Sequence, residues 1–143
     1  MDTPSQKSLA PARSFTDLIA WKEGHQLALL IYKVTEGFPK HELFGLTSQI
    51  RRAAVSITSN LAEGFGRPSK PDKIHFYYIS LSSVYEIQNQ GLLARDIGYL
   101  SKEHFKDIAD RSVRVAKLIN SLIRSIKLPA TSYQLPATQH VAS

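Results

Sequence analysis

Four segments of the chain carry apolar residues at intervals of three and four, the spacing that places side chains on one face of an α-helix. No stretch shows the persistent alternation that a β-strand requires. Phe38-Pro39 ends the first stripe and Gly64-Phe65-Gly66 ends the second. The expected core positions, in chain order, are Leu18, Trp21, Ala28, Tyr32 and Thr35; Leu46, Ile50, Ala53, Ala54, Ile57 and Leu61; Phe76, Ser80, Ser83, Ile87, Gly91, Ala94 and Ile97; and Phe105, Ile108, Ser112, Val115, Ile119, Leu122 and Ile126.

Boundary residues support these four helices. Ser69 and Pro71 mark the start of the third, and Ser101 is placed to cap the fourth. Because the turns are short, the segments predict an all-α fold, an antiparallel up-down-up-down four-helix bundle over residues 15–127. The third stripe is rich in small residues, so a close helix approach is expected there. Residues 1–14 and 128–143 lack apolar periodicity and are expected to be flexible tails.

The first and third helices carry more apolar residues than one core contact explains. These two helices are diagonal in an up-down bundle, so their extra residues point to different sides of the molecule. A contact between one copy's first helix and another copy's third helix is heterologous and generates a closed ring or an open filament, of which we expect a ring. The alternative is a monomer with scattered surface apolar residues. The expected oligomer interface comprises Leu27, Leu30, Val34, Tyr78, Leu81, Tyr85 and Leu92.

Composition narrows the class of protein. The 143 residues are 43% hydrophobic and carry a net charge of +6. None of them is a cysteine, which excludes disulfides, thiolate catalysis and cysteine-zinc sites. The longest apolar run, Leu27–Tyr32, is too short to span a membrane, and we expect no secretory signal in the first residues. We therefore expect a cytoplasmic protein with no membrane partner. The positive charge favours an acidic partner, nucleic acid first.

The residue patterns of common active sites are missing. The five histidines are His25, His41, His75, His104 and His140, and no two share a helical turn as a zinc site of the His-x-x-x-His kind requires. Neither a Gly-x-Ser-x-Gly motif nor a phosphate-binding glycine loop between a strand and a helix is present. We expect no metal, no cofactor, no catalytic residues and no enzyme activity.

A polar stripe follows one flank of the second helix. Because a half-buried arginine needs a fixed acceptor, Arg52 is expected to pair with Glu86 or with another helix's acid. The stripe can serve as a polar seam or subunit contact, which we favour, or as a binding face. With the neighbouring Arg51, its residues are Gln49, Arg51, Arg52, Ser56, Asn60 and Glu63.

Basic residues gather in two places that an up-down bundle brings to the same end of the molecule: the turn after the second helix and the end of the fourth. In a ring such a cluster repeats once per subunit and forms a surface that can contact phosphates. The alternative is a solvated basic end that keeps the protein soluble. The candidate contacts to RNA or DNA are Arg67, Lys70, Lys73, Arg124 and Lys127.

Several motifs resemble those of one family. They are Phe15-x-Asp17-Leu18-x-x-Trp21, Ile31-Tyr32, Phe38-Pro39, Glu42-x-x-Gly45-Leu46-Thr47-x-Gln49-x-Arg51-Arg52-Ala53-x-x-Ser56-Ile57 and Asn60-Leu61-Ala62-Glu63-Gly64-x-Gly66-Arg67. Together they resemble the four-helix-bundle family encoded by intervening sequences in bacterial 23S ribosomal RNA genes. They are more distantly similar to the accessory proteins of diversity-generating retroelements.

The resemblance implies a four-helix protomer that assembles into a pentameric ring, and it implies no settled activity. The retroelement relatives suggest nucleic-acid binding on a basic ring surface. The chain departs from the family pattern at Ser80-Leu81-Ser82-Ser83, and Leu81 stands where relatives often carry a charge. Two functions follow as hypotheses: an oligomeric protein that binds RNA or DNA through its basic end, or a structural or protein-interaction scaffold that never meets nucleic acid.

Overall fold

The computed structural model describes residues 11–127, and all its regular elements within that range are helical. Two short 3-10 turns, η1 (Phe15–Asp17) and η2 (Lys40–Glu42), precede the first and second long helices. The four long helices are α2 (Ile19–Thr35), α3 (Leu46–Phe65), α4 (Lys70–Asp96) and α5 (Lys102–Lys127). The predicted all-helical class and its four helices are confirmed. The expectation of flexible tails falls mostly on residues 1–10 and 128–143, which lie outside the described residues.

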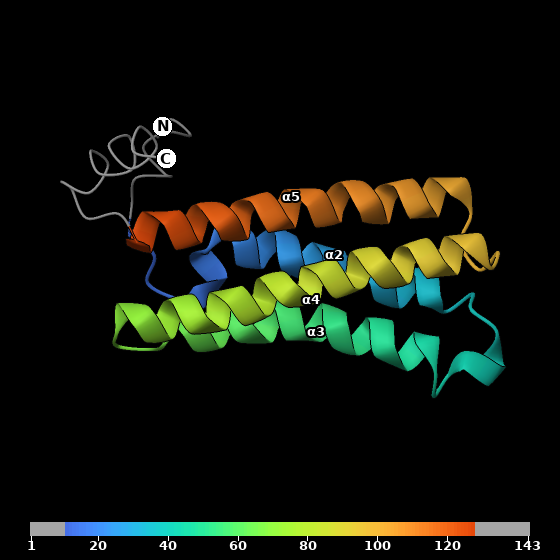
Figure 1. Cartoon of the computed structure of the whole chain (residues 1–143), viewed down its shortest axis with the longest axis horizontal. Helices are drawn as coiled ribbons and strands as arrows, with labels where there is room; N and C mark the ends of the chain where they lie inside the picture. The colour runs from blue at the N-terminus through green and yellow to red at the C-terminus, as the bar shows by residue number, and fades with distance from the viewer. Residues whose placement is uncertain (1–10, 128–143) are drawn as a thin grey trace, which may run out of the picture.

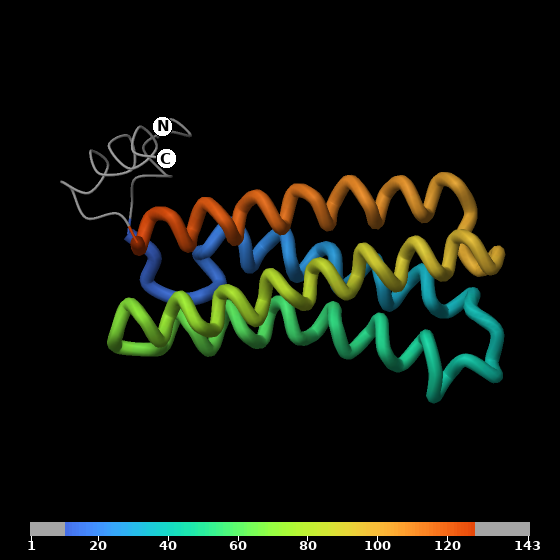
Figure 2. The backbone as a smooth tube through the Cα atoms, viewed as in Figure 1, coloured from blue at the N-terminus to red at the C-terminus, as the bar shows by residue number. Residues whose placement is uncertain are grey.

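The helices lie side by side, and the chain reverses direction at each connection between them (Figures 1 and 2). α3 packs against α2 and α4, while α5 packs against α4 and α2. α2 and α4 are therefore diagonal to each other in the bundle. The α3–α4 turn and the end of α5 lie at one end of the molecule, and the α2–α3 and α4–α5 connections lie at the other.

The helix boundaries follow local hydrogen bonds. The side chain of Ser69 accepts a bond from the Asp72 backbone N–H (3.2 Å) at the start of α4, and Ser101 accepts one from His104 (3.1 Å) at the start of α5. Both predicted caps are confirmed, because each hydroxyl satisfies an N–H that a helix start leaves free.

Contacts at the amino-terminal side begin before residue 15. The Asp17 carboxylate accepts bonds from the backbone N–H groups of Arg13 (2.9 Å) and Ser14 (3.2 Å), which lower the pKa of Asp17, with the Arg13 contact the larger cause. Ser14 in turn caps η1. The ordered contacts therefore start two residues earlier than the expected domain boundary.

The core confirms most of the predicted stripes. All six predicted positions of α3 are buried, as are Ile108, Ser112, Val115 and Ile119 of α5. Five of the seven predicted α4 positions are buried, whereas Phe76 is half-buried and Ile97 is exposed. Phe105, Leu122 and Ile126 pack at the edge of the core.

The predicted stripe of α2 is correct at Thr35 and otherwise about one residue out of phase, with Trp21 and Ala28 packed at the edge of the core. Its buried positions are Ala20, Gly24, Leu27, Ile31, Val34 and Thr35. Leu27 (0% exposed) and Val34 (8%) therefore belong to the core and not to the expected oligomer interface, and Tyr32 is exposed instead of buried. Because the run Leu27–Tyr32 is apolar throughout, the sequence does not show which of its residues face the core. A shift of one residue turns the buried face of a helix by about 100°.

Leu81 of α4 is a second correction, because it is 6% exposed and lies in the core instead of on the expected interface. α4 packs against both α3 and α5, so its buried side is wider than a single stripe. Tyr77, Leu81 and Val84 extend that buried side beyond the predicted positions.

Small residues bring α3 and α4 close together, as predicted. The Ser80 hydroxyl donates to the Ile57 carbonyl oxygen (2.7 Å), and the Ser83 hydroxyl donates to Ser56 Oγ (2.8 Å). At the end of α3 the buried ring of Tyr77 covers Gly64, where an added Cβ would lie 2.7 Å from Tyr77 Cε1 and 3.1 Å from Phe76 Cβ.

Replacing Gly64 with alanine should destabilise the bundle. The added methyl must displace a buried ring, and such overpacking costs about 2 kcal/mol. Gly66→Ala is the matched control, because a Cβ there meets only backbone oxygens at 3.7 and 3.9 Å. Urea unfolding followed by circular dichroism should show a lower free energy of unfolding for Gly64→Ala and an equal or higher one for Gly66→Ala. Equal stability of the two variants would refute the close contact.

Candidate functional site

The residues of the predicted polar stripe of α3 have different roles in the structure. Ser56 and Asn60 are bonded to each other: Asn60 Nδ2 donates to the Ser56 carbonyl oxygen (2.8 Å) and to Ser56 Oγ (3.0 Å), which also accepts from Ser83. These two residues form a polar seam between α3 and α4, one of the roles expected of the stripe.

Arg51 holds α2 against α3. Its Nε donates to Thr35 Oγ1 (2.8 Å), and its guanidinium lies 4.8 Å from the centre of the Tyr32 ring. The Thr35 hydroxyl donates onward to the Ile31 carbonyl oxygen (2.7 Å). Arg51 thus ties together two helices through a buried threonine, and it lies against the exposed ring of Tyr32.

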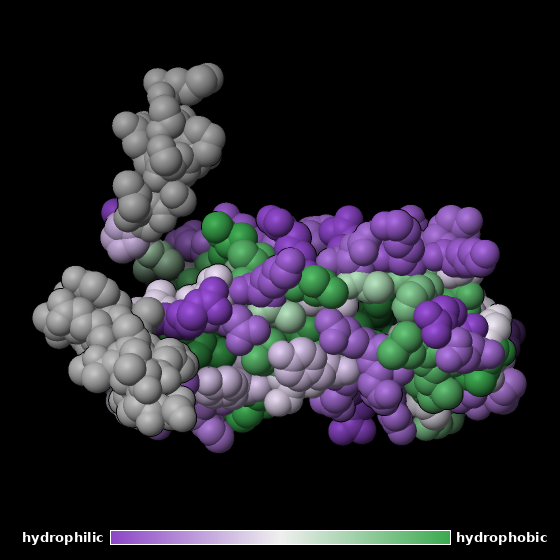
Figure 3. Space-filling model, turned by 45° about the horizontal axis from the view of Figure 1, so that its top comes forward, coloured by the Kyte–Doolittle hydropathy of each residue, from purple (hydrophilic) through white to green (hydrophobic). Residues whose placement is uncertain are grey.

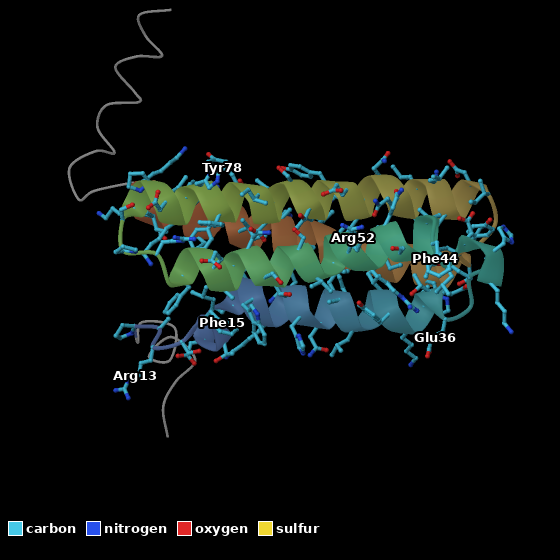
Figure 4. All side chains as sticks on the ribbon, turned by 90° about the horizontal axis from the view of Figure 1, so that it is seen from below. Arg13, Phe15, Glu36, Phe44, Arg52 and Tyr78 are labelled. Carbon is cyan, nitrogen blue, oxygen red and sulfur yellow. The ribbon has the colours of Figure 1, made fainter. Side chains whose placement is uncertain are left out.

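Arg52 points to the opposite side, into a groove between α3 and α4 (Figure 4). Glu86 lines the same groove, but the ion pairs of the described residues do not include one between Arg52 and Glu86, so the expected pair does not form within this chain. The side chain of Gln90 is 9% exposed, and its buried Oε1 has no hydrogen-bond partner within the described chain. The groove measures about 390 Å³ and is lined by Gln49, Arg52, Ala53, Ser56, Glu86 and Gln90.

The five basic candidates gather at one end of the bundle, where α3 passes into α4 and α5 ends (Figure 1). Lys73 Nζ donates to the Phe65 carbonyl oxygen (2.7 Å) at the end of α3, and Lys127 Nζ donates to Tyr78 Oη (2.8 Å). Arg124 Nη2 donates to Ser121 Oγ (3.1 Å), and Lys70 is exposed.

Aromatic rings lie between these charges, a feature that the sequence reasoning missed. Arg67 lies 4.7 Å from the centre of the Phe76 ring, Lys73 lies 5.4 Å from that of Phe65, and Lys127 lies 5.1 Å from that of Tyr78. Arg67 also forms an ion pair with Glu63 of the polar stripe (2.9 Å). Only Phe65 is next to the basic turn in the sequence. Phe76 and Tyr78 belong to the first turns of α4, and the fold brings them to the basic end.

The expected interface residues divide by exposure. Tyr78 (43% exposed), Tyr85 (51%) and Leu92 (44%) lie on the outside of α4, whereas Leu30 is half-buried. On α2, Leu27 and Val34 are buried, and the apolar residues exposed on the outside include Leu29 and Tyr32. Figure 3 shows hydrophobic residues interrupting the hydrophilic surface, most densely at the end of the molecule opposite the end of α5.

Two further findings concern residues 11–127. Within this range no three histidine, cysteine, aspartate or glutamate side chains gather as a metal ion requires. None of the described helices combines the length and the apolar character needed to cross a membrane.

The fold and its motif residues define a class: a four-helix bundle with a polar seam between α3 and α4 and apolar residues left outside. Residues 16–121 match the family model of the 23S rRNA-intervening sequence proteins, and the chain belongs to this family. A solved structure of a protein of unknown function from the S23 ribosomal protein family of Bacteroides thetaiotaomicron shares its fold, with a TM-score of 0.69 and 23% identity over 74% of this chain and 96% of that one. No curated protein matches the chain.

The two neighbouring arginines should behave differently on substitution. Arg51→Gln removes a charge-assisted bond to buried Thr35 and should lower the free energy of unfolding by about 1 kcal/mol. Arg52→Gln, at an exposed position, should change it by less than about 0.5 kcal/mol. Urea titration of both variants measures the difference. A larger loss for Arg52→Gln than for Arg51→Gln would contradict these assignments.

Proposed function

We propose that this chain is the non-enzymatic subunit of a homo-oligomeric ring. The observation that supports this proposal most is the outer surface of α4. Tyr78, Tyr85 and Leu92 recur there every seven residues, and each leaves more than two-fifths of its surface exposed. A helix with apolar residues on all sides is stable in water when its outer side is also covered.

The geometry of the patches favours a ring over a two-fold dimer. The outer apolar residues of α2, Leu29 and Tyr32, belong to the helix diagonal to α4. A contact that joins the α2 side of one copy to the α4 side of the next uses two different surfaces, and such contacts repeat until they close. The resemblance to the family suggests five subunits.

The polar groove between α3 and α4 supports an assembly role as well. The buried Gln90 Oε1 needs a donor, which a neighbouring subunit can supply, and the exposed Arg52 in the same groove can pair with an acid of that subunit. In contrast, most of the described ionisable groups with shifted pKa values owe those shifts mainly to hydrogen bonds within the chain, while burial raises the pKa of Tyr77. The Tyr99 hydroxyl, whose pKa is raised mainly by its bond to Glu42, is an example. This favours a binding protein over an enzyme.

Nucleic-acid binding at the basic end is a second candidate function. The supporting observation is that Arg67, Lys73 and Lys127 each lie over an aromatic ring at the end where Lys70 is exposed. Cations bind phosphates and rings stack on bases, so a ring of such ends provides a repeated surface for RNA or DNA. The competing scaffold hypothesis assigns these charges to solubility alone.

Changing the outer face of α4 should break the ring. In the double variant Tyr85→Asp with Leu92→Asp, two carboxylates replace apolar contacts that a neighbour would desolvate. We expect the mass measured by light scattering to fall from that of the wild-type assembly to that of one or two chains. Val113→Asp on α5, at a position 46% exposed, is the matched control and should keep the wild-type mass. An unchanged mass in the double variant refutes the proposed face.

A binding titration tests the second candidate. Wild-type protein should bind structured RNA or duplex DNA at low salt, and its affinity should fall as salt rises, because each phosphate contact on duplex DNA contributes a slope of about 0.9. Lys70→Ala with Arg124→Ala should weaken binding and reduce that slope, since both side chains are exposed. Fluorescence anisotropy at two salt concentrations measures both quantities. Lack of binding at low salt would leave the scaffold function.

A further inference from the structure

A phenylalanine stands almost free of the molecule in the connection between α2 and α3. Phe44 is 94% exposed, the largest value among the exposed large hydrophobic residues of the described chain, and its neighbour Leu43 is 51% exposed. In Figure 4, Phe44 lies toward the same end of the molecule as Glu36 and away from Tyr78. Single exposed apolar residues are common on proteins, so exposure alone assigns Phe44 no role.

The turn that carries Phe44 is fixed on both sides. The Glu42 carboxylate accepts bonds from the Leu46 backbone N–H (3.1 Å) and from Tyr99 Oη (2.8 Å), and these contacts, the Leu46 bond first, lower the pKa of Glu42. Gly45 lies so close that a Cβ there would be 2.7 Å from Glu42 Oε1. Phe44 is thus held outward between two constrained residues.

An exposed aromatic ring on a fixed turn is suited to binding. Because the backbone that carries Phe44 is already ordered, less entropy is lost on binding than for a residue on a mobile loop. An aromatic side chain also buries about 150–250 Å² when it enters a pocket, so it is an effective anchor.

A groove large enough for an aromatic ring begins at Leu43, the residue before Phe44. It lies between the end of α2, η2 and the start of α3 and measures about 310 Å³, roughly twice the ~150 Å³ of a cavity that accepts benzene. Its walls include the buried Phe38 and the half-exposed Leu43. Its lining residues are Thr35, Glu36, Phe38, Pro39, Lys40, Leu43, Thr47 and Arg51.

We propose that Phe44 of one copy enters this groove on a second copy, and that the second copy's Phe44 enters the groove of the first. Ring and groove are adjacent in one chain, so a two-fold contact fills both grooves and covers both rings at once. The groove also carries Glu36 and Lys40, charges of opposite sign, which a self-complementary contact can pair across the two-fold axis. This end-on contact differs from the lateral contacts within a ring of subunits, because it does not use the α4 face. It joins two such rings of subunits end to end.

Photo-cross-linking from position 44 tests the contact directly. A photoreactive phenylalanine analogue at this position keeps the ring and should join two chains, with the adduct on residues 35–51 of the other copy. Leu43→Asp places a carboxylate in the groove wall and should abolish the adduct, while Val113→Asp should not. An adduct elsewhere, an adduct within one chain, or no adduct overturns the proposal.

The mass of the Phe44→Ala variant tests the end-on contact independently. This variant should have half the mass of the wild-type assembly by light scattering, with an unchanged circular dichroism spectrum because the side chain is exposed. An unchanged mass overturns the end-on contact. The two proposals fail separately, because the α4 variant Tyr85→Asp with Leu92→Asp should lose the ring and keep the cross-link from position 44.

Discussion

The close approach of α3 and α4 is the constraint on which much of the molecule depends. Ser80 and Ser83 donate directly to groups of α3, and Tyr77 covers Gly64 with no room for a methyl group. Because small side chains fill this contact, several of the large apolar residues of α4 lie elsewhere. Some, such as Leu81, pack in the core, while Tyr78, Tyr85 and Leu92 remain outside. The packing inside the bundle thus leaves an apolar surface for a neighbour to cover.

The polar residues of the same contact have complementary roles. Ser56 and Asn60 satisfy each other and Ser83, which fixes the register of the two helices. On the other side of α3, Arg51 joins this helix to α2 through its hydrogen bond to Thr35. Gln90 Oε1 is buried without a partner in the groove between α3 and α4, and the exposed Arg52 lines the same groove, so a polar groove lies beside the exposed apolar face of α4. Both features favour a subunit over an isolated monomer.

The sequence predicted the fold class, the four helices, the caps Ser69 and Ser101 and six of the buried positions of α3, because spacing and cap chemistry are local properties. It failed for the phase of α2, since six consecutive apolar residues fit several faces and the choice depends on where Arg51 and Gly24 meet their neighbours. The sequence pattern likewise could not show that Phe44 projects or that Phe76 and Tyr78 join the basic end. Those features depend on turn geometry and on contacts between residues far apart in the chain.

The mass of the wild-type protein in solution tests the central claim most directly. Sedimentation over a wide concentration range should give a constant mass that is a multiple of five chains of 16.0 kDa each. The outer face of α4 and the groove beside it would then be covered by neighbouring copies. A single 16.0 kDa chain at every concentration would contradict the account.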